Sequence, residues 1–187
     1  MKVVRAEHAG VCYGVERALD MVRDAMDGDE DVFTIGPLIH NPRVVAQLKD
    51  HGVESIEGPA DVDHGIVVLR THGVEPSVVE ELDERGLSSI DATCPHVSRA
   101  QKAAADFAAQ GMTVLVIGRA SHPEVRGICA HAAGSAVVVA DASEIPADIA
   151  GPVGIVVQTT ENKSKLDEVV ADLRGRGIEP VVKKTIC

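Results

Sequence analysis

Aromatic residues are scarce in this sequence: its 187 residues include no Trp, one Tyr and two Phe, although 45% of them are hydrophobic. The apolar positions are filled mainly by Val, Ala, Ile and Leu. A core rich in β-branched residues suits parallel strands that helices bury on both faces. The composition therefore predicts an α/β protein, and the chain is long enough to bury a substantial core.

Basic residues are outnumbered, with 18 Lys and Arg against 29 Asp and Glu and a formal net charge of −11. This acidic balance argues against a nucleic-acid-binding surface, so we expect no nucleic-acid partner. It also means that any anionic ligand must be held by local hydrogen-bond donors, because the field of the whole molecule repels it.

Long apolar runs are missing, since none approaches the roughly 20 residues that cross a bilayer. The start, MKVVRAEHAG, lacks the hydrophobic region of a signal peptide. We therefore expect a cytoplasmic protein with no membrane partner. In that reducing compartment, the four cysteines are expected to be thiols or metal ligands rather than disulfides: Cys12, Cys94, Cys129 and Cys187.

Three common motifs are also absent. Without a C-x-x-C pair, a zinc ribbon or a two-cysteine redox loop is disfavoured. The lack of H-x-x-x-H or H-x-H spacing weakens the hypothesis of a mononuclear zinc hydrolase with His and Cys ligands. No G-x-G-x-x-G follows the first predicted strand, which argues against a nucleotide-binding oxidoreductase.

What the sequence does contain is an alternation of strand and helix patterns, which predicts parallel sheets. Strands are expected within 2–6, 31–35, 65–71, 88–92, 112–118, 135–140, 154–159 and 178–182, and helices within 14–26, 42–52, 76–86, 95–111, 122–132 and 162–177. The expected architecture is two similar small α/β lobes whose parallel sheets are flanked by helices. We divide the chain into an N-terminal strand with the first cysteine (1–13), a first lobe (14–95) and a second lobe (96–187).

Chemically versatile residues gather where a predicted strand passes into a helix: Cys12, His40, His72, Cys94, His122 with Glu124, and Thr159. In doubly wound sheets these junctions share the carboxyl edge, where ligands bind. Helix starts there offer unpaired N–H groups to an anion. The pattern predicts an anion site, and widely separated cysteines at this edge could meet at one cluster.

Seven segments of the chain resemble a known family: AGVCYGVERAL, IHNPRVV, RTHGV, DATCPHV, SHPEVRG, QTT and the final KKTIC. In this order and spacing they are similar to 4-hydroxy-3-methylbut-2-enyl diphosphate reductase, the LytB-type iron–sulfur reductase that ends the non-mevalonate isoprenoid pathway. The resemblance covers the whole sequence.

The resemblance implies a [4Fe–4S] cluster held by Cys12, Cys94 and Cys187, with one iron open to the allylic hydroxyl of the substrate. It implies that His40, His72 and His122 face the diphosphate or hydroxyl end, that Glu124 donates a proton, and that Thr159 contacts the hydroxyl side and helps to relay the proton. Reductive loss of the hydroxyl would give isopentenyl and dimethylallyl diphosphate, with a ferredoxin or flavodoxin as electron donor.

Family members continue past the residue that matches Cys187 into a third α/β lobe, which also pairs with the N-terminal strand. The resemblance therefore implies a chain truncated after the third cluster cysteine, with that lobe absent. An alternative function is a truncated, inactive scaffold that binds diphosphate without turnover.

Structural roles are also open to several of these residues. Ser121 and Glu124 form the S-x-x-E pattern of a helix capping box, and Thr159 or Thr160 could be a helix N-cap. Cys129 is expected to be a core thiol. The remaining histidines are expected to be surface or structural residues: His8, His51, His64, His96 and His131.

Overall fold

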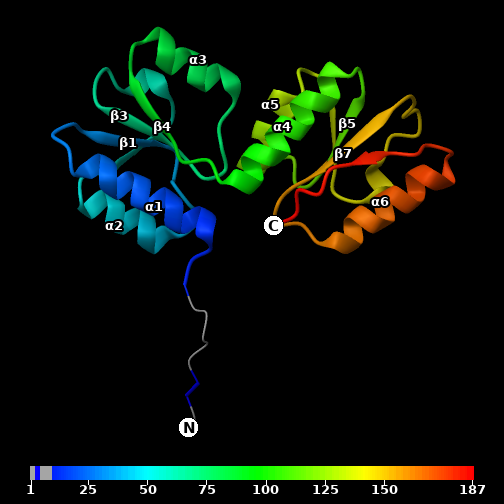
Figure 1. Cartoon of the computed structure of the whole chain (residues 1–187), viewed down its shortest axis with the longest axis horizontal. Helices are drawn as coiled ribbons and strands as arrows, with labels where there is room; N and C mark the ends of the chain where they lie inside the picture. The colour runs from blue at the N-terminus through cyan, green and yellow to red at the C-terminus, as the bar shows by residue number, and fades with distance from the viewer. Residues whose placement is uncertain (1–2, 5–9) are drawn as a thin grey trace.

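A computed structural model describes residues 3–4 and 10–187 and contains two α/β lobes side by side (Figure 1). The helices are α1 (Tyr13–Met26), α2 (Pro42–Asp50), α3 (Pro76–Glu84), α4 (Pro95–Ala109), α5 (Pro123–His131) and α6 (Lys163–Gly175), with short 3₁₀ turns η1 (Pro59–Asp61) and η2 (Ala142–Glu144). The strands are β1 (Val32–Ile35), β2 (Glu54–Ile56), β3 (Ile66–Leu69), β4 (Ser88–Asp91), β5 (Thr113–Ile117), β6 (Ala136–Val139), β7 (Val153–Val157) and β8 (Val181–Val182).

Each lobe is built on a four-stranded parallel sheet, and the two sheets share one topology. The strand orders are β2-β1-β3-β4 and β6-β5-β7-β8. In each sheet the chain begins at a central strand, adds a neighbour on one side and then crosses to the other side. The point where the direction reverses lies between β1 and β3 in the first sheet and between β5 and β7 in the second. The predicted fold class is confirmed, whereas the domain boundaries at 13/14 and 95/96 stay predictions.

The strands alternate their side chains between two helix-covered faces, as a buried parallel sheet requires. In the second sheet, Val114 and Val116 pack with α4 and α5, while Leu115 and Ile117 pack with α6. The first sheet is covered by α1 and α2 on one face and by α3 on the other, as Figure 1 shows. Helix α4 belongs to the second lobe, because its buried residues pack against the second sheet.

Proline fixes the start of four helices, because its preset φ and missing N–H are tolerated in the first turn. Pro42, Pro76, Pro95 and Pro123 are the first residues of α2, α3, α4 and α5. All six predicted helices are confirmed. The residues directly before these prolines are thereby held at defined helix starts.

Two strand predictions need comment. The sequence pattern missed β2, whose three residues are too few to show a period and are mostly exposed. The strand predicted at 2–6 lies largely outside the described residues, and Val3 and Val4, which are described, belong to no strand. Within the described part of the chain, no helix combines the length and apolarity needed to cross a membrane.

Candidate active site between the two lobes

A pocket of about 370 Å³ lies where the two lobes meet. It collects all eight residues that the sequence singled out as site candidates, from both sheets. Its lining consists of Cys12, Gly14, Val15, His40, Thr71, His72, Cys94, His96, Val97, Arg119, His122, Glu124, Thr159, Thr160 and Cys187. The catalytic, binding and ligating roles of these residues stay predictions.

The topology explains why residues so distant in sequence come together. His40 follows β1 and His72 follows β3, so both leave the reversal point of the first sheet. His122 follows β5 and Thr159 follows β7, at the matching point of the second sheet. Ligands of open α/β sheets bind at such points. The pocket is therefore bounded by the two reversal points.

Three histidines form a compact group in this pocket. The ring centroids of His40 and His72 are 4.1 Å apart, and that of His122 lies 5.4 Å and 5.6 Å from them. Burial, and then repulsion by His40, His122 and Arg70, lowers the pKa of His72 to about 4. Burial and nearby positive groups also lower the pKa of His122. His72 is therefore neutral at pH 7 while no anion is bound.

The tautomer of His122 is set by the helix that it caps. His122 is the N-cap of α5, and its Nδ1 accepts a hydrogen bond from the backbone N–H of Glu124 at 3.2 Å. A neutral imidazole that accepts at Nδ1 carries its proton on Nε2. His122 therefore offers an N–H donor, which suits an anionic oxygen.

Glu124 hydrogen-bonds to the end of β7 and does not take the alternative role of closing a capping box with Ser121. The N-cap of α5 is His122 rather than Ser121. The Glu124 carboxylate accepts the backbone N–H of Thr159 at 2.6 Å and its hydroxyl at 2.9 Å. The His122 imidazole already caps the first turn of α5, so the Glu124 carboxylate can bond to the end of β7 instead.

Glu124 is only 1% exposed. Burial raises the pKa of its carboxyl group, although the two hydrogen bonds from Thr159 oppose the shift. Desolvation disfavours the charged form of a carboxyl group, so the proton is retained to higher pH than usual. Glu124 can therefore hold a proton next to a hydroxyl that is able to pass it on.

Cys12 and Cys94 are the N-caps of α1 and α4, and neither side chain forms a capping hydrogen bond. The starts of α1 and α4 pack closely: a Cβ on Gly14 would lie only 2.6 Å from Cys94 Sγ. The positive ends of both helix dipoles favour negative ligands here. Two thiols from distant parts of the chain thus line one pocket.

Cys187 is fixed next to Thr159. Its backbone N–H donates to the Thr159 carbonyl oxygen at 2.8 Å. Two residues earlier, the buried Thr185 hydroxyl accepts the N–H of Val157 at 3.0 Å and donates to its carbonyl at 2.7 Å. These bonds extend the edge of the second sheet and hold the third thiol at the pocket.

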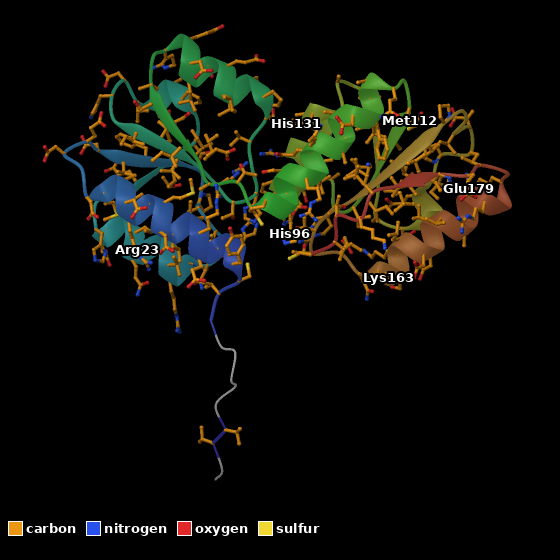
Figure 2. All side chains as sticks on the ribbon, viewed as in Figure 1. Arg23, His96, Met112, His131, Lys163 and Glu179 are labelled. Carbon is orange, nitrogen blue, oxygen red and sulfur yellow. The ribbon has the colours of Figure 1, made fainter. Side chains whose placement is uncertain are left out.

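Sequence reasoning missed Thr71, His96 and Arg119, which also line the pocket. Figure 2 shows His96 at the start of α4, where the lobes meet, and its Nδ1 is buried without a partner among the described residues. Its place two residues after Cys94, in the first turn of the same helix, was a usable signal. Thr71 and Arg119 follow β3 and β5 as Thr159 follows β7, so their position was a usable signal as well.

The other histidines and Cys129 have separate surroundings. His51 and His131 bond to backbone carbonyls one turn earlier in their helices, and His64 pairs with Asp31 and Asp63. His8 lies outside the described residues. Cys129 lies on α5 and packs against the core, and burial raises the pKa of its thiol, as expected for a core residue.

The sequence profile of the LytB protein family matches residues 3–187. The chain belongs to the LytB family. LytB relatives named 4-hydroxy-3-methylbut-2-enyl diphosphate reductase are 40% identical in Trichlorobacter lovleyi and 39% identical in a Geobacter species (strain M21). Each alignment covers all of this chain and 67% of the relative. The resemblance inferred from seven short motifs is thereby confirmed.

Solved structures agree with the LytB assignment. A structure of (E)-4-hydroxy-3-methyl-but-2-enyl diphosphate reductase, the terminal enzyme of the non-mevalonate pathway, superposes with a TM-score of 0.87 at 36% identity. That match covers 99% of this chain and 68% of the other. The reductase of Plasmodium falciparum gives a TM-score of 0.86 at 26% identity, over 95% and 58% of the two chains. The chain thus spans about two thirds of the length of its bacterial LytB relatives.

Proposed function

We propose that this chain acts in the reductive removal of the allylic hydroxyl of 4-hydroxy-3-methylbut-2-enyl diphosphate. Two electrons and two protons are consumed: one proton leaves with the hydroxyl group as water, and the other is added to the allylic carbon skeleton to give isopentenyl or dimethylallyl diphosphate. The observation that carries the proposal is one pocket that unites three thiols, three imidazoles and a buried Glu–Thr pair. The names of the relatives supply the substrate.

The donor set fits an iron–sulfur cluster better than a single ion. Cys12, Cys94 and Cys187 share the pocket, yet the only described group tight enough for a single ion is the histidine trio. Cluster irons are spread out, so their thiolates need not converge on one point. When bound to these three cysteines, a [4Fe–4S] cluster would supply electrons and one open iron as a Lewis acid toward the alcohol.

The histidine trio is proposed to hold the diphosphate. Its nitrogens lie within 4.8 Å of one another, so one phosphate group can contact several of them. His122 presents an Nε2–H donor, and the start of α5 adds its dipole. Arg119 in the pocket wall adds a positive charge. These local donors overcome the repulsion expected from a net charge of −11.

Glu124 and Thr159 are proposed to move the proton. The Thr159 hydroxyl donates to Glu124 in the structure; when Glu124 is protonated, this hydroxyl can pass its own proton to the leaving hydroxyl and take one from Glu124. A bound diphosphate would raise the pKa of Glu124 further, because a nearby negative charge disfavours the carboxylate. Glu124 and Thr159 are both buried, so solvent has little access to the pair that moves the proton.

A mononuclear zinc hydrolase is the second candidate, since the trio is tight enough for one ion. A metal needs a lone pair from each imidazole, however, and the single lone pair of neutral His122 is already used at Nδ1. Zinc would have to break the cap of α5 to bind there. The trio is therefore better suited to donate to an anion.

The electron donor is proposed to be a ferredoxin or a flavodoxin, and the compartment to be the cytoplasm. All four cysteines are free thiols. Free thiols and a cluster with an open iron are both favoured by a reducing compartment.

An anaerobic assay tests the proposal. The chain is reconstituted with iron and sulfide, supplied with a chemical reductant and the allylic diphosphate, and its products are separated by chromatography. Isopentenyl and dimethylallyl diphosphate are the expected products. Substrate binding without turnover by a cluster-loaded chain would instead favour the inactive scaffold, and stoichiometric zinc without sulfide would favour the hydrolase.

A further inference from the structure

Gln101 is a buried polar residue beside the site that the proposed chemistry does not use. It lies on α4, seven residues after Cys94, and is only 7% exposed. Its amide nitrogen has no hydrogen-bond partner among the described residues. A buried donor of this kind destabilises a protein, because its bond to water is lost without replacement. Its position therefore calls for an explanation beyond stability.

Two glycines, one from each lobe, make room for this amide. A Cβ on Gly73 would overlap Gln101 Nε2 and lie 3.2 Å from its Cδ. A Cβ on Gly127 would lie 3.1 Å from the same nitrogen. Gly73 follows His72 in the turn after β3, and Gly127 lies on α5, three residues after Glu124. The carboxamide thus sits between the His72 turn and the helix that carries His122 and Glu124.

Acceptors for the unused donor are close by. The Cβ position of Gly127 is also 3.7 Å from the Val74 carbonyl oxygen and 3.8 Å from that of His72. The Gln101 amide, the backbone of the His72 turn and α5 therefore converge on one point. Neither carbonyl oxygen is hydrogen-bonded to Nε2 in this structure.

We infer that Gln101 is a positioning residue for the candidate active site. Its carboxamide spaces the His72 turn (His72–Val74) of the first lobe against α5 of the second, and it donates to a carbonyl of that turn when an anion draws the histidines together. This inference rests on the proposed function, because the distance between the two elements affects how tightly His72 and His122 bind a diphosphate.

The first test distinguishes the hydrogen-bond donor of Gln101 from the space that its side chain fills. Gln101→Met keeps the length of the side chain but removes the donor. We expect this variant to resist urea at least as well as the wild type, while its calorimetric Kd for inorganic diphosphate rises about twofold to tenfold, the value of one hydrogen bond. Gln110→Met, an exposed change at the end of the same helix, is the matched control and should change neither quantity.

The second test is a double-mutant cycle across the contact. In the wild type, Gly127→Ala places a methyl group against the amide and should weaken diphosphate binding. In the Gln101→Ala background the space is free, so the same change should have little effect on binding. Non-additivity of this kind is the signature of a direct contact.

The inference is overturned if Gln101→Met binds diphosphate with the Kd of the wild type and the effects of the Gln101 and Gly127 substitutions on binding are additive. If the wild type itself binds no diphosphate, the proposed function fails, and the backbone amide NMR signals of His72 and Gly73 decide the inference alone. Their displacement in Gln101→Met but not in Gln110→Met would support the positioning contact. Unchanged signals would refute it.

Discussion

At the scale of single residues, the contact between Glu124 and Thr159 decides what the glutamate can do. The S-x-x-E spacing allowed a capping role, but the His122 imidazole occupies the cap and both carboxylate oxygens bind Thr159. No local pattern predicts this pair, because its partners are 35 residues apart and meet only through the order of β5 and β7.

Glu124→Gln should abolish most of the turnover and leave binding in place. The amide cannot supply a proton, so kcat of the cluster-loaded chain is expected to fall about 100-fold or more. Calorimetry should show that the variant binds inorganic diphosphate at least as tightly as the wild type, since the neutral amide does not repel the anion. Glu168→Gln, at an exposed position of α6, is the control. Equal loss of kcat in both variants, or intact turnover in Glu124→Gln, would contradict the role of Glu124.

His72 should make the metal-free chain sensitive to acid. Its pKa of about 4 in the folded chain lies below the ordinary histidine value of 6.5, so protonation favours the unfolded chain. Its contribution to stability is complete above pH 6.5 and is lost as the pH falls toward 4, with a slope of at most about 1.4 kcal/mol per pH unit.

Urea unfolding at several pH values checks this expectation. The stability of His72→Gln should decline less steeply between pH 6.5 and 4 than that of the wild type, because both proteins share all other titrating groups. Above pH 7 the two curves should run parallel. Identical slopes throughout would mean that His72 is not buried beside positive groups.

At the scale of elements, helix starts place the site residues, and these starts were largely predictable. Proline after Cys94, Asn41 and His122 marked three helix starts correctly. The short strand β2 was not predictable, because three mostly exposed residues carry no clear period. Nor could the role of Thr185 be foreseen, since its hydroxyl binds a strand end 28 residues away.

The N-cap of α2 provides a test at this scale. Asn41 accepts the backbone N–H groups of Arg43 and Val44, and it directly follows His40. Asn162 caps α6 in the same way through Ser164, and it does not line the pocket. Replacement of either residue by Ala should reduce the free energy of unfolding by about 1 kcal/mol.

Only Asn41→Ala should also weaken the binding of inorganic diphosphate, by about threefold, since the loosened helix start carries His40. Comparison of Kd values and urea midpoints for the two variants separates positioning from general stability. An equal effect of both variants on Kd would show that the start of α2 does not place a diphosphate ligand.

At the scale of the whole molecule, two sheets of the same topology face one pocket with their reversal points. The sequence predicted the sheets, their carboxyl edges and seven of the eight residues, because strand–helix junctions can be recognised locally, whereas Cys187 was predicted from the family resemblance. The inter-lobe packing of Gln101 between Gly73 and Gly127 could not be predicted, because it depends on how the lobes meet.

The central claim is that Cys12, Cys94 and Cys187 hold one cluster while Cys129 does not. Iron and acid-labile sulfide per chain, measured after anaerobic reconstitution of the wild type and of four single Cys→Ser variants, test it most directly. Cys129→Ser is expected to bind as much iron and as much sulfide per chain as the wild type. Each of the other three variants is expected to bind markedly less of both. A colourless wild type, or a loss confined to Cys129→Ser, would contradict the account.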